Sequence, residues 1–228
     1  MKKTLKNGSV REKTARTGGY ENMITVALAK GRLADKTMEI LAACGYDCAA
    51  LLAEKTRKLV LAEPSGALRF IFVKPSDVPV YVEYGVADIG VCGSDTLLEA
   101  DAGIYELLDL KFGKCRLCIA GYPDYAARRG DTLRVATKYA NITGNYYHNK
   151  GENVKIIRLN GSVELGPVMG LSDLILDIVE SGSTLRDNGL SVLHEICAVS
   201  ARLVCNKVSL KIKSEEIKPL VAKIKSAL

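Results

Sequence analysis

The chain has 228 residues, of which 48% are hydrophobic and 25% are charged, so it is expected to fold into one large domain or two lobes. No uncharged apolar run approaches the ~18 residues of a membrane span, and the N-terminus lacks the apolar stretch of a secretory signal. We therefore expect a cytoplasmic protein with no membrane contact. Seven cysteines scattered through apolar segments are typical of reduced thiols, not of a disulfide framework.

The positive charge is concentrated at one end of the chain. The formal net charge is +6, but residues 1–22 hold six lysines or arginines against two glutamates, which leaves +2 for the rest. Because this segment has no apolar periodicity, we expect a disordered basic extension, with phosphate or partner contact as the alternative. The nearly neutral body and the 6% aromatic content predict no nucleic-acid binding.

One cysteine pair has the spacing of redox and zinc sites. Cys115 and Cys118 are three residues apart. The surrounding "CRLCIA" has the pattern of a strand, however, and residues three apart in a strand point to opposite faces. His148 and His194 are far apart in the sequence and lack ligand spacing. We expect no metal site built from these side chains.

The first ordered elements are a strand over residues 24–28 and a helix that continues to Gly45. Lys30, Gly31 and Arg32 fall in the loop between them. In open α/β sheets such loops line the ligand crevice, and a helix N-terminus there favours anions. The alternative is that both basic side chains are ordinary solvated loop charges.

The alternation of strands and helices continues. Residues 58–62, preceded by Arg57, and residues 68–73 have strand patterns; residues 76–85 have the pattern of a helix, with Pro79 in its first turn. Residues 87–93 follow as a strand, and Ser94 or Asp95 can cap the helix at 96–100. This order predicts a mostly parallel sheet.

A second α/β lobe is predicted by the pattern that restarts near residue 114. Strands are expected at 115–120, 132–139, 154–161 and 171–179, with helices at 141–151 and 162–170. The last helix, 214–228, has an apolar stripe. We therefore expect lobe I from residues 23–113 and 196–228, lobe II from residues 114–195, and a cleft between the two.

The corner "DIVESGSTLRDNGL", residues 177–190, combines acids, hydroxyls and a glycine where a strand meets a helix. Backbone N–H groups of residues 181–185, together with the Ser183 and Thr184 hydroxyls, suit a phosphate, and Gly182 permits its close approach. Asp177 and Glu180 can accept hydrogen bonds from ribose hydroxyls or help to hold hydrated magnesium. Ordinary capping residues at a helix start are the alternative.

This corner resembles the phosphoribosyl-pyrophosphate loop of the ATP phosphoribosyltransferase family. The likeness spans about residues 24–207 and includes "LAKGRL", "SDVPVYVEYGVADIGVCGSD", "ELLDLKFGKCRLCIAG", "RVATKY" and "NGSVELGP". Only 21 residues follow Lys207, as in the short catalytic form of the family. The resemblance implies the fold of type II periplasmic binding proteins, two α/β lobes around a cleft.

The activity that the resemblance implies is the first step of histidine biosynthesis. Adenine N1 of ATP attacks the anomeric carbon of phosphoribosyl pyrophosphate, and pyrophosphate leaves with inversion. Arg32 and Arg57 match family arginines at the pyrophosphate, where planar guanidinium groups suit phosphate oxygens. A cytosolic solute- or nucleotide-binding sensor with the same fold is the alternative.

The resemblance also implies further binding residues and partners. Lys30 and Gly31 are expected at a polyphosphate, and Asp95 and Glu164 near the cleft. The ribose 5-phosphate is expected on Glu180, Ser181, Gly182, Ser183, Thr184 and Leu185, with Asp177 beside it. Mg²⁺ is expected through the substrate phosphates. The expected assembly is a homodimer that joins a regulatory subunit similar to histidyl-tRNA synthetase in a hetero-octamer.

Overall fold

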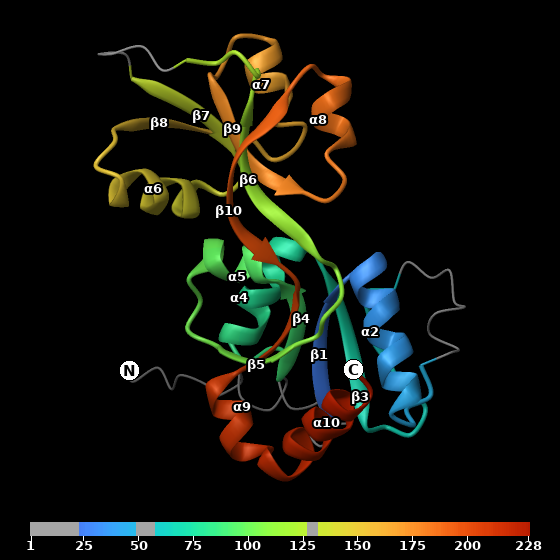
Figure 1. Cartoon of the computed structure of the whole chain (residues 1–228). Coiled ribbons are helices and arrows are strands. Elements are labelled where there is room, and N and C mark those ends of the chain that lie inside the picture. Colours follow the sequence, from blue (N-terminus) through green and yellow to red (C-terminus); the bar gives the residue numbers. More distant parts are fainter. Residues whose placement is uncertain (1–22, 49–57, 127–131) are drawn as a thin grey trace, which may run out of the picture.

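The structure is a computed structural model that describes residues 23–48, 58–126 and 132–228. The predicted basic extension and Arg57 lie outside these ranges. The described chain forms two α/β lobes, each built on its own sheet, with the chain crossing between them at a narrow waist (Figure 1). This confirms the two-lobe architecture predicted from the sequence.

The first sheet has six strands in the order β2-β3-β1-β4-β11-β5. These strands are β1 (Ile24–Ala29), β2 (Val60–Ala62), β3 (Leu68–Val73), β4 (Ile89–Gly93), β5 (Tyr105–Asp109) and β11 (Ala201–Cys205). Its helices are α2 (Arg32–Ala43), the 3-10 turn η1 (Pro75–Asp77), α4 (Val78–Glu83), α5 (Ser94–Ala100), α9 (Lys207–Ile212) and α10 (Ser214–Ser226).

The central strand β1 is buried on both sides. Alternate residues of β1 face two separate apolar clusters, with Val26 and Leu28 in one and Ala27 and Ala29 in the other. Helices α2 and α10 fill the first cluster, and α4 contributes to the second. The predicted stripe of α10 is confirmed for its buried members, which are Ile217, Leu220 and Ile224.

The second sheet has five strands in the order β10-β6-β9-β7-β8. These strands are β6 (Cys115–Gly121), β7 (Leu133–Thr137), β8 (Val154–Arg158), β9 (Leu174–Val179) and β10 (Ser191–Val199), and the helices are α6 (Ala140–Asn149), α7 (Leu165–Val168) and α8 (Ser183–Asp187). Cys115 packs on one face of β6 and Cys118 on the other, as the strand pattern predicts.

Both sheets are mixed, so the prediction of a mostly parallel sheet is wrong. β1 pairs in parallel with β3 and β4, and β7 pairs in parallel with β8 and β9. The strands next to the crossovers pair antiparallel: β11 with β4 and β5, and β6 with β9 and β10. Because β11 returns from the other lobe, it enters the first sheet against the direction of its neighbours.

The two crossover segments are hydrogen-bonded to each other at the waist. The Leu110 amide donates to the Ala201 carbonyl at 2.9 Å, and the Ala201 amide donates to the Phe112 carbonyl at 2.9 Å. The Ser200 hydroxyl donates to a carboxylate oxygen of Asp109 at 3.0 Å. β10 remains in the second sheet through Val199, so that sheet extends past the boundary expected between residues 195 and 196.

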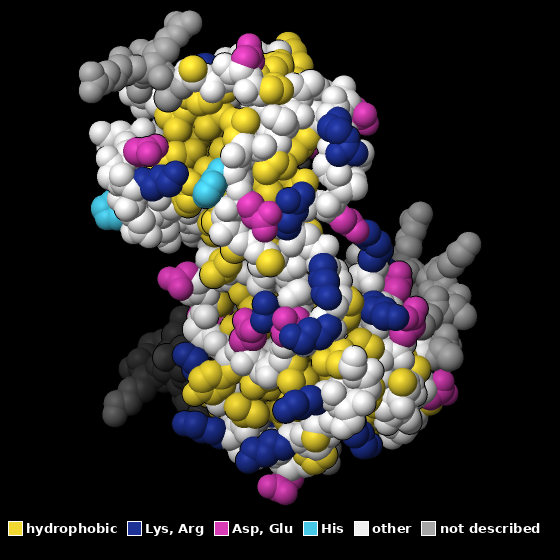
Figure 2. Space-filling model, in the orientation of Figure 1, with side chains coloured by type: hydrophobic (Ala, Val, Ile, Leu, Met, Phe, Trp, Pro, Cys, Tyr) yellow, Lys and Arg dark blue, Asp and Glu magenta, His cyan; other side chains and the backbone are white. Residues whose placement is uncertain are grey.

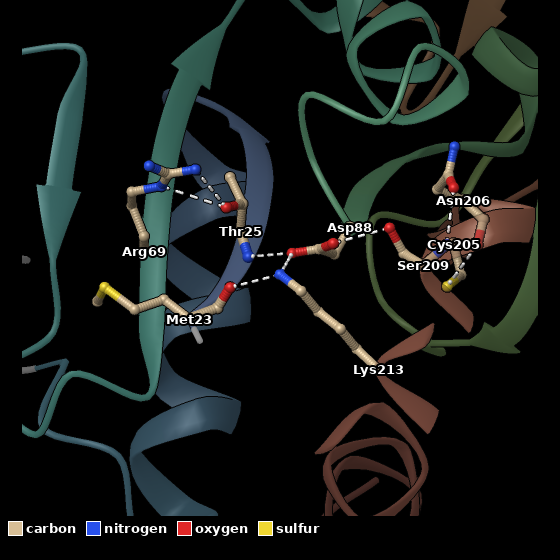
Figure 3. A network of polar contacts seen from close by, with 8 residues as sticks. All are labelled: Met23, Thr25, Arg69, Asp88, Cys205, Asn206, Ser209 and Lys213. Atoms are coloured by element: carbon tan, nitrogen blue, oxygen red, sulfur yellow. Dashed lines mark hydrogen bonds and ion pairs between the residues drawn. The ribbon is translucent and has the colours of Figure 1, made fainter. Parts of the chain in front are cut away.

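A buried carboxylate joins the start of the first lobe to its end (Figure 3). Asp88 accepts hydrogen bonds at 2.8 Å from the Thr25 amide and from the Lys213 ammonium, and one at 2.7 Å from the Ser209 hydroxyl. Lys213 also donates to the Met23 carbonyl at 2.8 Å. Because each buried polar group has a partner, the network holds the C-terminal helices against β1.

The surface is unevenly charged. On the face shown in Figure 2, Lys and Arg side chains gather over the lobe of the first sheet and near the waist. Within the described ranges, no helix combines the length and apolar character that a membrane span needs.

Candidate active site

A cavity of about 800 Å³ lies between the lobes. Arg32, Asp95 and Phe112 contribute to its wall from the first lobe and its crossover, and Asp177 and Leu185 contribute from the second. The strands β1, β4 and β9 all end at this cavity, so the loops and helices that follow them carry most of the polar lining. This is where α/β sheets place ligand-binding groups.

Most of the residues predicted for the site line this cavity. They are Arg32, Asp95, Glu164, Asp177, Glu180, Ser181, Gly182, Ser183, Thr184 and Leu185. Lys30 and Gly31 are exposed beside it and are not part of the lining; the Lys30 ammonium lies 5.4 Å from the centre of the Phe72 ring. Arg57 falls outside the described residues.

Arg32 reaches the cavity because of the turn before it. β1 ends at Ala29, and Gly31 adopts φ 113°, which L side chains rarely adopt. α2 then begins at Arg32 itself, with Leu33 and Lys36 also in the cavity wall. The glycine therefore allows an immediate change from buried strand to helix and places a guanidinium at the cavity edge.

Arg32 forms an ion pair across the cavity with Glu180. The two guanidinium nitrogens donate to the two carboxylate oxygens at 3.1 and 2.9 Å. This pairing lowers the pKa of Glu180 and raises that of Arg32. The side chains are 86% and 61% exposed, so water and salt screen the contact, and an anionic ligand can replace it at little cost.

The loop from Glu180 to Leu185 has an internally ordered shape. β9 ends at Val179, Gly182 adopts φ 70°, and α8 begins at Ser183. The side chain of Leu185 is buried and anchors the loop to the second core, whereas Ser181, Ser183 and Thr184 are exposed. The loop therefore presents hydroxyl groups and helix-start N–H groups to the cavity.

Two acidic residues lie deeper in the cavity. Burial raises the pKa of Asp177, and its Oδ1 atom is buried with no hydrogen-bond partner among the described residues. Asp95 is buried, and its Oδ2 atom accepts a hydrogen bond of 2.5 Å from the Tyr139 hydroxyl. Burial, followed by the nearby charge of Asp95, raises the pKa of Tyr139, so its hydroxyl stays protonated and acts as a donor.

The expected capping role of Ser94 or Asp95 is not found. The N-cap position of α5 is Gly93, no side chain caps this helix, and both residues lie within its first turn. The Asp95 carboxylate is directed to Tyr139 instead. Because α5 begins at Ser94, two residues before the expected helix, neither residue occupies the N-cap position.

Several cavity residues were missed from the sequence. They are Lys36, Lys114, Cys115 and Lys138. Lys36 lies one helical turn after Arg32, and Lys138 follows the end of β7, so helical spacing and the strand-end rule point to both. Burial raises the pKa of the Cys115 thiol to about 11, so this cysteine is a neutral group at pH 7 and not a thiolate nucleophile.

The described residues contain no group of three or more His, Cys, Asp or Glu side chains arranged to hold a metal ion by themselves. The cavity does hold separate carboxylates, Asp95, Glu164, Asp177 and Glu180. Carboxylate oxygens are ligands that Mg²⁺ accepts alongside phosphates and water. These carboxylates are therefore chemically able to contact Mg²⁺ or its water shell.

Two α/β lobes around a polar cavity define a two-lobed ligand-binding fold of the periplasmic-binding-protein type. The VFT2 domain of Bordetella pertussis BvgS has this fold, with a TM-score of 0.53 over 96% of this chain and 98% of that one. The sequence identity is 12%, so the similarity concerns the fold alone.

The model of the HisG family, described as ATP phosphoribosyltransferase, matches residues 74–226, and the chain belongs to this family. The ATP phosphoribosyltransferase of Lachnospira eligens is 52% identical over 206 residues, which are 89% of this chain and 95% of that protein. The enzyme of Alkaliphilus metalliredigens is 51% identical over 203 residues, with coverage of 89% and 97%. The resemblance drawn from the sequence is confirmed.

Among solved structures, the ATP phosphoribosyl transferase (HisG:HisZ) complex from Thermotoga maritima matches with a TM-score of 0.79 and 36% identity. The match covers 90% of this chain and 98% of that chain. The protein is therefore an ATP phosphoribosyltransferase, a transferase of histidine biosynthesis, and the alternative of a non-enzymatic sensor is not favoured.

Proposed function

We propose that the interlobe cavity is the active site and that phosphoribosyl pyrophosphate binds to its second-lobe wall. The ribose 5-phosphate would meet the N–H groups and hydroxyls of residues 181–185, and Glu180 would accept hydrogen bonds from the ribose. Two observations support this proposal. Gly182 has a positive φ that suits a tight turn without a side chain, and every residue of the predicted loop lines the cavity. Asp177 lies on the adjacent strand β9.

Arg32 is proposed to act on the charge of the leaving group. As adenine N1 attacks the anomeric carbon, the sugar gains positive character and the pyrophosphate gains negative charge. A cation already positioned there lowers the barrier because it need not reorganise during the reaction. The pyrophosphate would take the place that Glu180 occupies beside Arg32, and this exchange would free Glu180 for the ribose. Arg57 is proposed for the same role on the basis of the family match alone.

The remaining polar residues in and beside the cavity are proposed to bind ATP, including its polyphosphate. Lys30 lies beside the cavity and Lys36, Lys114 and Lys138 line it, so cations are available for both substrates. Asp95 and Glu164 provide acceptors for hydroxyl or amino groups. Gly31 has no side chain, so it would allow the backbone to approach a phosphate closely.

Mg²⁺ is proposed to enter with the substrates. When bound, it would neutralise phosphate charge and assist departure of pyrophosphate. Asp177 and Glu164 are the residues suited to contact its water shell, because both line the cavity and Asp177 has a buried oxygen without a partner. A cytoplasmic location is also proposed, in keeping with the relatives' biosynthetic role.

The chain is further proposed to work as a homodimer within a hetero-octamer. The support is the Thermotoga maritima structure, which is described as a HisG:HisZ complex. The partner proposed here is a regulatory subunit similar to histidyl-tRNA synthetase. Histidine would act by favouring some states of this assembly over others, since an effector that binds all states equally shifts none of them.

The test of the proposed chemistry is an assay of the purified chain with ATP, phosphoribosyl pyrophosphate and magnesium, with and without the partner. The adduct and pyrophosphate should appear in equal amounts. Absence of the adduct in every condition, while both substrates still bind, would count against the proposed reaction at this site and would favour a sensor.

A further inference from the structure

The carboxylate of Asp95 is held by a residue from the opposite lobe. The Tyr139 hydroxyl donates to Asp95 Oδ2 at 2.5 Å, and the two residues are only 3% and 7% exposed. Asp95 belongs to the first turn of α5 in the first lobe, and Tyr139 directly precedes α6 in the second. This buried contact differs from the exposed Arg32–Glu180 pair, because water does not compete for it.

Tyr139 is fixed within its own lobe by its backbone. Its amide donates to the Thr137 hydroxyl at 2.8 Å, and its carbonyl accepts from the Thr143 hydroxyl at 2.6 Å. Thr137 in turn donates to the Leu176 carbonyl at 2.6 Å on β9. The backbone of Tyr139 is thus anchored to the second sheet, and its side chain is buried.

The absence of a side chain at Gly93 also favours one orientation of the Asp95 carboxylate. A side chain at Gly93 would collide with Asp95 Oδ1, so glycine at this position leaves room for the carboxylate. Gly93 and Asp95 both line the cavity. One carboxylate oxygen is therefore taken by Tyr139, while the other lies over the glycine at the cavity wall.

A second contact keeps the two helices in register. The Glu99 carboxylate of α5 accepts hydrogen bonds from the backbone amides of Asn141 and Ile142, each at 3.0 Å, in the first turn of α6. The Asn141 side chain donates to the Glu99 carbonyl at 2.9 Å. Since Glu99 lies one turn after Asp95, these bonds hold the start of α6 where Tyr139 can reach it.

We propose that Tyr139 is a positioning residue that directs the Asp95 carboxylate toward a hydrogen-bond donor of the substrate, a hydroxyl or an amino group. This inference rests on the proposed placement of Asp95 in the substrate site. A carboxylate without this bond rotates among several orientations, and a misplaced acceptor costs binding. Tyr139 couples the orientation of Asp95 to the arrangement of the lobes, because the bond exists only while the lobes are close.

The test is a double-mutant cycle with Tyr139→Phe, Asp95→Asn and the double variant, assayed for kcat and for KM of both substrates. Each single change should lower kcat/KM about tenfold, the loss expected for one buried hydrogen bond to a charged group. The kcat/KM of the double variant should be no lower than that of the less active single variant. The KM of one substrate should rise and that of the other should not; a smaller folded fraction cannot produce this result.

Tyr147→Phe is the matched control, because Tyr147 is also 3% exposed, belongs to α6 and does not line the cavity. Its kcat/KM should stay within about twofold of the parent, since no substrate contact changes. Unchanged kinetics in Tyr139→Phe, or losses that multiply in the double variant, would overturn the positioning role alone. Unchanged kinetics in Asp95→Asn would overturn both that role and the placement of Asp95 in the substrate site.

Discussion

The Arg32 guanidinium and the Glu180 carboxylate meet across the interlobe cavity in a two-pronged ion pair, at 3.1 and 2.9 Å. They are 148 residues apart in the chain and belong to different lobes. In the proposed mechanism one acts on pyrophosphate and the other on ribose, so binding of the substrate must separate them. Before the substrate binds, each residue thus neutralises the charge of the other.

Replacing Arg32 by Ala should raise the barrier of the chemical step by ~2–4 kcal/mol and so slow that step, as for loss of one preorganised donor. Substrate binding should weaken less, because the charge that Arg32 stabilises grows mainly in the transition state. Single-turnover kinetics measure this rate directly. Arg116→Ala is the control: Arg116 forms an exposed ion pair with Glu195 outside the cavity lining. Equal single-turnover rates for Arg32→Ala and the parent would contradict the assigned role.

The Arg32–Glu180 contact also makes a prediction about protonation. Arg32 lowers the pKa of Glu180 by hydrogen bonding and by its charge, so the Glu180 pKa should rise in Arg32→Ala. Carboxyl NMR titration of the ligand-free chain measures this change. With both partners present, Glu180 should become protonated at a lower pH than it does in Arg32→Ala. A Glu180 pKa that is the same in both chains would show that the contact does not form in solution.

The phosphate loop can be tested at Gly182, which has φ 70°. Gly182→Val should abolish binding of phosphoribosyl pyrophosphate in calorimetry, because a β-branched residue is strained at this φ and its side chain crowds the loop. Gly170→Val is a matched control: Gly170 has φ 69°, open space around it and no part in the cavity. Both variants should lose ~1–2 kcal/mol of stability from strain, but only the first should lose affinity. Equal affinity in the two variants would refute the loop assignment.

The contacts of Asp109 at the waist predict a loss of stability at acid pH. A hydrogen bond from the Lys111 amide is the main cause that lowers the pKa of Asp109 to about 2, with further bonds from the Lys111 and Ser200 side chains. Because this pKa is below the value in the unfolded chain, the stabilisation is complete above about pH 5 and is lost as the pH falls toward 2. Asp109→Asn should therefore be less stable than the parent at pH 6, and the difference should shrink by pH 2.5. Urea unfolding at the two pH values measures it; a constant difference would contradict the prediction.

Regulation by a partner can be tested with the chain alone and in the assembly. The isolated chain is expected to be a dimer with modest activity and little response to histidine. Addition of the regulatory subunit should raise activity and confer inhibition together. Activity assays across a histidine titration, with light scattering for the oligomer, measure both. Strong inhibition of the chain alone, at histidine concentrations that inhibit the complex, would contradict the partner proposal.

Local patterns in the sequence predicted much of the fold. The strand expected at residues 24–28 is β1 (Ile24–Ala29), and the helix after it is α2 (Arg32–Ala43). The strand-to-helix corner near Gly182 is β9 followed by α8. These predictions succeeded because apolar periodicity and glycine positions act over a few residues, and they are written directly in the sequence.

Other features were missed because they depend on distant partners. β5 (Tyr105–Asp109) was not predicted, and it pairs with β11, which lies about 95 residues later in the chain. The antiparallel direction of β11 follows from its return across the waist, which no local pattern reveals. Strand order and direction are set by pairing between distant segments, so periodicity alone cannot predict them.

Ordered motifs from residue 24 to residue 207 were enough to predict the family, the two-lobe architecture and the residue types near the strand ends, because such motifs are specific when they occur together. Which of these residues face one another became apparent only in the folded structure. Arg32 meets Glu180, and Tyr139 meets Asp95, from opposite lobes of the protein. Contacts of this kind depend on how two separately folded cores are placed relative to each other, and no local pattern in the sequence reveals that placement.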